Sequence, residues 1–367
     1  MEPVKLSGAT ALKIAFTADL HLTDSSTNPE RFKVLADILG QCGAEDIQLL
    51  VIAGDLFDKT GLNYAEFEAV YTKNRPDKLK TIIIPGNHDQ DLNPASISGE
   101  GLNIYDKPVI RPLNDSLLVL FLPYQANQTM GEAIAPYTSE LRGKRWILIG
   151  HGDLTGGQKS PDPYESGVYM PLTGSDLAAY QPEVAFLGHI HLPQKKDRVH
   201  YPGSPCPLNI TETGPRSFLI FDTKTGKISA KEINSTLEYY DLSFVMVPAK
   251  DDLDILASEV KSTIASWSHT KTRKDFIQVR VKIGGTSWSD RSQIIKTVNK
   301  AFSGYRFYQD QGPILKDLKH DIDPDKARIA RKFKTWIEDL EWDTSENQPD
   351  KSQILEEALK TIYHVKS

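Results

Sequence analysis

The sequence predicts an α/β protein built in layers, with β-sheets flanked by helices. Over the first two-thirds of the chain, short apolar segments of strand length alternate with amphipathic segments of helix length, which is the order that covers sheets with helices. Polar clusters follow where the predicted strands end, as they do at the ligand sites of open α/β sheets. The 367 residues exceed one ordinary core, so we expect more than one domain.

The predicted elements of the first domain, residues 1–235, follow from apolar content and periodicity. Six segments read as buried strands: 13–18, 47–53, 81–85, 116–123, 146–149 and 184–187. Between them, four segments with helical periodicity are expected to form helices: 29–41, 64–73, 128–141 and 174–180. Two further strands, 217–222 and 227–233, flank a Thr-Gly turn and are expected to close a hairpin.

The pattern restarts near residue 236, which predicts a small α/β cap domain over 236–320. Its expected elements are a strand, a helix, a strand, a helix and a short strand, in this order: 239–247, 253–264, 276–283, 289–302 and near 305. The last stretch, 321–367, predicts two amphipathic helices at 325–342 and 350–365. Two such helices cannot bury both of their apolar stripes alone, so we expect them to dock on the body or on a partner.

Composition excludes several classes of protein. The chain is 39% hydrophobic and 25% charged, as soluble globular proteins are, and its longest apolar runs are far too short to span a membrane. No signal-peptide core follows Met1, and Cys42 and Cys206 are the only cysteines, so we expect a cytoplasmic protein without disulfides.

The charge is unevenly distributed along the chain. The net charge is −6, yet residues 261–300 hold nine Lys or Arg and only two acids. In the strand at 276–283, alternation places the apolar residues inside and Gln278, Arg280 and Lys282 on an open face. Such a basic block on an otherwise acidic protein suits contacts with backbone phosphates. The residues predicted to bind DNA are Lys271, Arg273, Lys274, Arg280 and Lys282. The alternative is a solvated strand face and loop.

Five polar blocks carry the chemistry. Each lies where a predicted strand ends: Asp19-Leu20-His21, Gly54-Asp55-Leu56-Phe57-Asp58, Gly86-Asn87-His88-Asp89, Gly150-His151-Gly152-Asp153 and Gly188-His189-Ile190-His191. In four of them a glycine directly precedes the polar residue, which suits a tight turn that aims the side chain off the strand edge. Any one block has a structural explanation, such as a helix cap or a satisfied core histidine. Together they would be a costly cluster of polar groups unless cations neutralise them, which predicts a metal site.

The order of these blocks resembles that of the calcineurin-like metallophosphoesterases. The resemblance implies two divalent ions, with Mn²⁺ favoured and Fe, Zn or Co compatible with the same ligands. Metal one is then held by four residues: Asp19, His21, Asp55 and His191. Metal two is held by another four, with Asp55 shared: Asp55, Asn87, His151 and His189.

The resemblance also implies a mechanism. A water between two cations loses its proton more easily, and the resulting hydroxide attacks phosphorus in line. His88 is the implied catalytic residue: it is not a ligand in the family pattern and stabilises the transition state or protonates the leaving oxygen. Asp89 is expected to orient the His88 ring, and Asp58 to support the site from behind the ligands. For Asp153 we favour a solvated loop carboxylate.

Three features resemble the SbcD-type branch, the DNA double-strand-break repair nucleases. They are the Leu122-Pro123-Tyr124 element, the segment Tyr201-Pro202-Gly203-Ser204-Pro205, and the cap that follows. This resemblance implies a Mn²⁺-dependent DNA exonuclease or endonuclease that acts on single- and double-stranded DNA and its ends in repair and recombination. It also implies an SbcC-type SMC-like ATPase as partner, which grips the C-terminal segment, and it allows a homodimer.

Two alternatives stay open from the residues alone. A small-molecule phosphodiesterase or a phosphatase of the same superfamily would use the same core, but would leave the basic cap unexplained. A catalytically silent scaffold of this fold would not need the intact ligand set or His88.

Overall fold

The computed structural model describes residues 12–155, 167–234, 237–267, 274–341, 349 and 351–364. The chain forms two compact units. The first comprises residues 1–208 and 215–236, and the second comprises 209–214 and 237–367. The second unit therefore takes up the segment predicted as a cap together with the two C-terminal helices.

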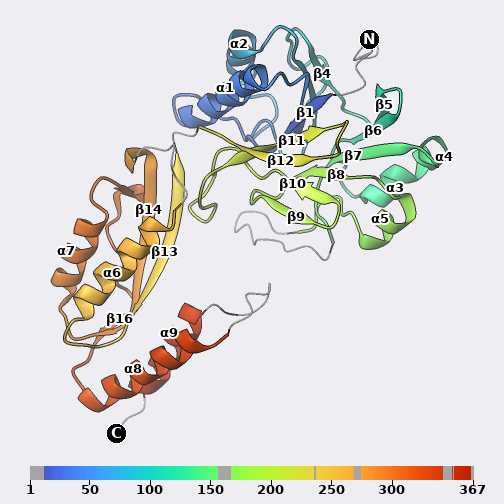
Figure 1. Ribbon diagram of the computed structural model, residues 1–367. Helices are drawn as coiled ribbons and strands as arrows, with labels where there is room; N and C mark the ends of the chain where they lie inside the picture. The colour runs from blue at the N-terminus through green and yellow to red at the C-terminus, as the bar shows by residue number, and fades with distance from the viewer. Residues whose placement is uncertain are drawn as a thin grey trace. The chain divides into compact units, whose positions relative to one another are not determined.

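The first unit contains two six-stranded sheets (Figure 1). The first sheet has the order β12-β11-β1-β2-β3-β4, and its strands are β1 (Lys13–Thr17), β2 (Leu49–Ala53), β3 (Lys80–Ile84), β4 (Leu102–Ile104), β11 (Ser217–Asp222) and β12 (Ile228–Glu232). The second has the order β5-β6-β7-β8-β10-β9, with β5 (Val109–Asn114), β6 (Leu117–Leu122), β7 (Arg145–His151), β8 (Ala185–Gly188), β9 (Gln194–Lys196) and β10 (Val199–Tyr201). In both sheets the central strands run parallel, so their carboxyl ends lie at one edge.

The two sheets pack face to face around one apolar core. Alternate residues of β1 to β3 meet those of β6 to β8 there, and the rings of Phe16 and Phe186 stack with their centroids 3.7 Å apart. Helices cover the outer faces: α1 (Pro29–Ala44), α2 (Tyr64–Asn74), α3 (Met130–Ile134), α4 (Thr138–Leu141) and α5 (Gly174–Tyr180). Met130, Ile134 and Leu177, for example, pack against Leu120 and Leu148 of the second sheet. The predicted layered α/β core is confirmed.

One predicted helix is interrupted. The segment 128–141 was expected to be continuous, but α3 ends at Ile134 and a 3-10 turn, Ala135–Tyr137, separates it from α4. Pro136 lies in this turn. Proline has no backbone N–H to donate and its ring crowds the preceding turn, so an α-helix does not continue through it.

The second unit is a smaller α/β layer. Its sheet contains β13 (Glu238–Met246), β14 (Ile277–Ser287), β15 (Arg306–Phe307) and β16 (Leu318–His320), and the other three strands all pair with β14 in parallel. Helices α6 (Asp252–Ala265) and α7 (Arg291–Ala301) share an apolar core with one face of this sheet. Along β14, buried apolar residues alternate with partly exposed polar ones from Ile277 to Ile283. The predicted period of two is therefore confirmed.

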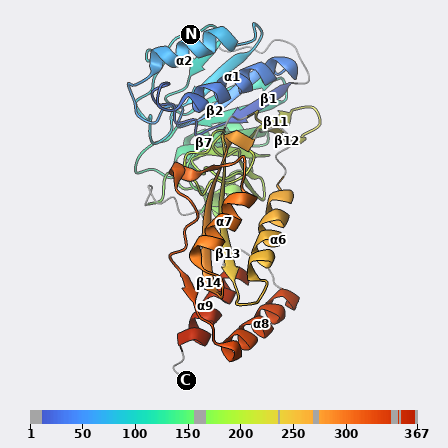
Figure 2. The same ribbon diagram turned by 90° about the vertical axis from the view of Figure 1, so that its left-hand side faces the viewer.

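The two C-terminal helices, α8 (Pro324–Asp339) and α9 (Lys351–His364), pack on the second unit itself. Figure 2 shows both beside the ends of β13 and β14. Ala330, Ile337, Leu355 and Leu359 form a small core with Val245 and Val247 of β13.

Only part of the apolar stripe predicted for the helix of α8 packs: of Ile329, Trp336 and Ile337, which the sequence places on one face, only Ile337 is buried. The buried positions include two alanines, Ala327 and Ala330, whereas Ile329 is 53% exposed and Trp336 is 58% exposed. The small residues let the helix lie close to its neighbours, while Ile329 and Trp336 point to solvent. None of the helices among the described residues combines the length and apolar character that a bilayer span requires.

Candidate metal centre

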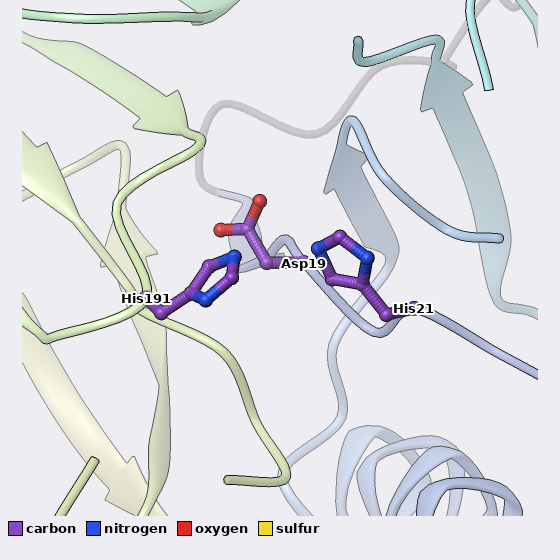
Figure 3. A group of neighbouring side chains, drawn as sticks. All are labelled: Asp19, His21 and His191. Atoms are coloured by element: carbon purple, nitrogen blue, oxygen red, sulfur yellow. The ribbon is translucent and has the colours of Figure 1, made fainter. Parts of the chain in front are cut away.

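The predicted ligands come from the carboxyl ends of strands in both sheets. Asp19 and His21 follow β1, Asp55 follows β2, and Asn87 follows β3; His151 ends β7, while His189 and His191 follow β8. The structure brings ligand atoms together in three groups within 4.8 Å: Asp19 with His21 and His191, His21 with Asp55 and His88, and Asp55 with His151 and His189. Figure 3 shows the Asp19 carboxylate lying between the rings of His21 and His191.

The distances between these atoms suit a shared ion. The Oδ1 atom of Asn87 lies 2.9 Å from Nε2 of His151 and 3.2 Å from Nδ1 of His189. The Oδ2 atom of Asp55 lies 3.3 Å from Nε2 of His151 and 3.6 Å from Nε2 of His21. Ligands about 2.1 Å from one ion lie roughly 3 Å from each other. One oxygen of Asp55 thus lies between the rings of His21 and His151, as a bridging ligand would.

Several buried polar atoms in the cluster lack a hydrogen-bond partner among the described residues. They are Oδ2 of Asp19, Nε2 of His21 and Oδ2 of Asp55, and these three residues are at most 2% exposed. A buried polar atom without a partner costs free energy, so such atoms gathered in one place call for a ligand. The donor set of imidazole, carboxylate and amide groups fits divalent transition-metal ions.

Further hydrogen bonds hold these side chains in place. The Nδ1 atom of His151 lies 2.8 Å from the carbonyl oxygen of Ala53. When Nδ1 donates there, Nε2 is left with a lone pair directed at the cluster. The Oδ1 atoms of the two carboxylates accept main-chain N–H groups, Asp55 from His88 and Asp19 from His189, both at 2.9 Å. Each carboxylate therefore turns its other oxygen to the cluster.

The electrostatics of the cluster favour positive charge within it. Burial raises the pKa of Asp19 above its ordinary value. Burial also acts to raise the pKa of Asp55, but the charges of His151 and His21 outweigh it and hold this pKa below its ordinary value. Burial lowers the pKa of His151, whereas Asp55 and Asp19 raise it, with a net result of about 10. The carboxylates thus attract a cation, and a proton on His151 serves as one when no other is there.

His88 lies beside the ligands. Its Nδ1 atom is 3.2 Å from the carbonyl oxygen of Asp58, and its ring centroid is 4.6 Å from that of His21. The Asp58 carboxylate in turn lies 3.4 Å from Nδ1 of His21, and this contact lowers the pKa of Asp58. Asp58 therefore contacts both histidines from behind the cluster. The catalytic role of His88 stays a prediction, because its position beside His21 and Asp55 suits a ligand as well.

Asp89 has a different place from the one predicted. Its two carboxylate oxygens accept the backbone N–H groups of Gly86, at 2.7 Å, and Phe57, at 3.1 Å. Burial, followed by the charge of Asp55, raises the pKa of Asp89 to about 7. Asp89 thus joins the loops after β2 and β3. Its carboxylate was expected to contact the His88 ring, but the carbonyl oxygen of Asp58 makes that contact instead.

Asp153 is a site residue that the sequence interpretation missed. We expected a solvated loop carboxylate, but Asp153 is only 6% exposed. Its Oδ1 atom lies 3.7 Å from Nε2 of His189, and its Oδ2 atom accepts the N–H of Tyr169 at 2.7 Å. The signal available in the sequence was its position two residues after His151, within one of the polar blocks.

The backbone of the site is strained. Four of the predicted ligands have left-handed φ angles: Asp19 at 55°, His21 at 44°, Asp55 at 50° and His189 at 95°. Residues with a side chain rarely adopt such angles, and where they do so in a cluster the site is usually functional.

The glycines of the blocks serve mainly to give space. A Cβ atom on Gly86 would lie 2.1 Å from Oδ1 of Asp55, and one on Gly188 would lie 2.0 Å from the carbonyl oxygen of Ala53. Neither residue has a positive φ angle. The tight-turn explanation therefore fails at these two positions, where the absence of a side chain lets two strand ends approach each other.

The residues predicted to bind DNA lie in the second unit and are not all free. Arg280 forms a bidentate ion pair with Asp241, its register partner on β13, and Lys282 lies 3.1 Å from the same carboxylate. Lys274 is exposed, with its ammonium 5.3 Å from the Tyr305 ring centroid. Lys271 and Arg273 lie outside the described residues. Asp241 therefore neutralises part of the predicted basic face.

Comparison with known proteins agrees with this centre. Residues 12–193 match the family model of the calcineurin-like phosphoesterases. This part of the chain belongs to that family, whose members hydrolyse phosphoesters with metal ions.

A relative and two solved structures are similar to this chain. The uncharacterized metallophosphoesterase YhaO of Bacillus subtilis (strain 168) is 25% identical over 311 residues, covering 76% of this chain and 73% of the relative. GAP50, described as the anchor in the inner membrane complex of Plasmodium, is 13% identical with a TM-score of 0.36, over 60% of this chain and 84% of its own. A novel archaeal phosphodiesterase is 16% identical with a TM-score of 0.31, and the match covers 60% of this chain and 99% of that structure's chain.

Proposed function

We propose that this chain is a metal-dependent DNA nuclease that hydrolyses phosphodiester bonds in DNA repair or recombination. The observation that carries the hydrolytic part is the convergence of seven predicted ligands from two sheets, with three buried atoms that have no hydrogen-bond partner within the described parts of the chain. Two divalent ions held there would activate a water nucleophile and neutralise the charge that develops on the phosphoryl oxygens. Mn²⁺ is the ion we favour, since imidazole ligands bind Mn²⁺ more readily than they bind Mg²⁺.

The chain's own residues divide the remaining work. The Nδ1 atom of His88 lies 3.2 Å from the Asp58 carbonyl oxygen, so Nε2 is the atom that would act on a phosphate oxygen or on the leaving oxygen. Asp58 and Asp89 hold His21 and the loops in position. These contacts are present without substrate, so they would hold the side chains in place for the reaction.

DNA as the substrate rests on the basic block of the second unit. Lys274, Arg280 and Lys282 are its described members among the predicted contacts, and two cations against the single carboxylate of Asp241 leave one positive charge on the strand face. Phosphate contacts of this kind position a duplex without reading its sequence.

A second candidate function is hydrolysis of a small phosphodiester. The observation that favours it is the same ion-pair cluster, because a cation that is already paired contributes less to DNA binding.

One assay separates these functions. Protein treated with EDTA should be inactive, and Mn²⁺ should restore cleavage of single- and double-stranded DNA more strongly than Mg²⁺ does. Cleavage of bis(p-nitrophenyl) phosphate but of no DNA would instead support the small-molecule enzyme. Activity in chelator would overturn both, and no activity on either substrate would support the silent scaffold.

We further propose an SbcC-type SMC-like ATPase as the partner of the C-terminal helices. The exposed Ile329 and Trp336 of α8 support this, because large apolar side chains in solvent commonly mark a surface that a partner covers. A homodimer is also expected from the family resemblance.

The docking proposal has a matched pair of variants. Ile329→Ala with Trp336→Ala should leave the melting temperature unchanged and abolish co-purification with the ATPase. Ile337→Ala, one position along but buried, should lower stability by about 2–5 kcal/mol through the cavity it leaves. Unchanged capture of the ATPase by the double variant would contradict the proposal.

A further inference from the structure

The two histidines predicted to hold metal two use different ring nitrogens: His151 faces Asn87 with Nε2, and His189 faces it with Nδ1. His151 presents Nε2 to Asn87, and its Nδ1 lies 2.8 Å from the carbonyl oxygen of Ala53. His189 presents Nδ1 to the same Asn87 oxygen at 3.2 Å, and its Nε2 lies 3.7 Å from Oδ1 of Asp153. Each ring therefore has one nitrogen for an ion and an acceptor behind the other, but only the acceptor behind His189 is charged.

Asp153 is itself held by the backbone of Tyr169 and Leu172. Its Oδ2 atom accepts the N–H of Tyr169 at 2.7 Å, and its own N–H donates to the Tyr169 carbonyl at 2.8 Å. The N–H of Leu172 donates to the Asp153 carbonyl, also at 2.8 Å. The Tyr169 ring lies 4.7 Å from the His189 ring, centroid to centroid. His189 thus has Asn87 at one ring nitrogen, Asp153 near the other and the Tyr169 ring beside it.

We propose that Asp153 is a positioning residue for metal two, acting through His189. Its carboxylate keeps the proton of His189 on Nε2, so that Nδ1 faces the ion with a lone pair, and it increases the basicity of that ligand. A carboxylate behind a histidine ligand has this effect in metal sites generally. The inference rests on the metal centre of the proposed function and not on its DNA substrate.

A purely structural role is the competing explanation, since Asp153 also binds the backbone of Tyr169. Asp153→Asn separates the two roles. An amide oxygen still accepts the Tyr169 N–H, while the negative charge opposite His189 is lost. A structural role therefore predicts little change in this variant, and a positioning role predicts a change confined to one ion.

The test is a titration of the full metal-free chain with Mn²⁺, followed by calorimetry and by electron paramagnetic resonance. We expect the unsubstituted protein to bind two ions. Asp153→Asn should bind one ion with unchanged affinity and the other about 10–100-fold more weakly. At two equivalents its resonance signal should be that of an isolated ion instead of a coupled pair. Melting of the metal-free variant should match that of the unsubstituted chain.

Asp176→Asn is the matched control. Asp176 also accepts a main-chain N–H, that of Thr173 at 2.9 Å, but it caps α5. This variant should keep both affinities.

Two results for Asp153→Asn would overturn the inference: both affinities intact with the coupled signal retained, or loss of both ions together with earlier melting of the metal-free protein. An unsubstituted chain that binds no ion would overturn the proposed function as well, which distinguishes the two failures.

Discussion

The metal centre and the basic face of β14 are both polar clusters on parallel strands, but their charges are satisfied differently. At the metal centre, Asp19 and Asp55 are completely buried and each keeps one oxygen without a hydrogen-bond partner among the described residues. On the β14 face, Asp241 satisfies Arg280 and Lys282 within the strand pair. The first cluster therefore holds buried charge that a bound cation would neutralise, whereas the second pairs its carboxylate with cations of the same chain. Unsatisfied buried atoms are the better guide to function.

Of the variants that test this difference, replacement of Asp55 should have the largest effect. Asp55→Ala should lose both ions, because Asp55 joins two of the three groups of ligand atoms, the one with His21 and the one with His151 and His189. Hydrolysis of bis(p-nitrophenyl) phosphate should then fall by more than about 10⁴-fold, since residues that act as one unit fail together. Metal analysis and the rate are the measurements, with Asp222→Ala, at a surface turn, as the control. Two retained ions would show that Asp55 does not bridge.

A variant of His88 tests whether this residue is a metal ligand or only a neighbour of the ligands. His88→Ala should keep both ions and lower turnover by about 10²–10⁴-fold, the usual contribution of a positioned acid. Metal stoichiometry and kcat are measured on the same preparation. If one ion is lost with the ring, His88 is a ligand, as its place beside His21 and Asp55 permits.

The basic face can be changed in two directions. Arg280→Glu with Lys282→Glu should weaken duplex binding and reduce its salt dependence by about one unit of slope for each lost phosphate contact. Asp241→Asn should have the opposite effect, because it releases both cations from their ion pair. Binding is measured over a range of salt concentrations.

The control for the basic face is a pair of exposed lysines outside the basic block, between β11 and β12. Lys224→Glu with Lys227→Glu should change duplex binding little. If Asp241→Asn leaves binding unchanged, the β14 face is structural and DNA is bound elsewhere or is not the substrate.

The smallest expected effect concerns stability. Burial acts to raise the pKa of Asp241, but the hydrogen bonds from Arg280 and Lys282 hold it below its ordinary value. The carboxylate therefore stabilises the folded state above the ordinary aspartate pKa, and this contribution is lost as the pH falls through the lowered pKa. Asp241→Asn should cost about 1 kcal/mol at pH 7 and nothing near pH 2, as measured by urea unfolding. An equal cost at both pH values would contradict the ion-pair explanation.

Sequence alone predicted much of the core and the place of the candidate site. Strand ends are local features, so Asp19, Asp55 and the histidine blocks could be assigned to one edge without any knowledge of packing. Pairing between distant segments was not available in the same way. The ion pair of Arg280 with Asp241 depends on the parallel register of β13 and β14, and the burial of Asp153 depends on the backbone of Tyr169. Both arise from contacts that no periodicity encodes.

The ligands divide between the two sheets: Asp19, His21, Asp55 and Asn87 extend from the first sheet, and His151, His189 and His191 extend from the second. Bound ions would therefore act as cross-links between the layers, at the end of a sandwich with an apolar interior. Heat resistance would then follow metal supply, because an ion that binds only the folded state at 100 times its dissociation constant adds about 2.7 kcal/mol. Metal depletion would weaken the association of the two sheets and abolish hydrolysis at the same time.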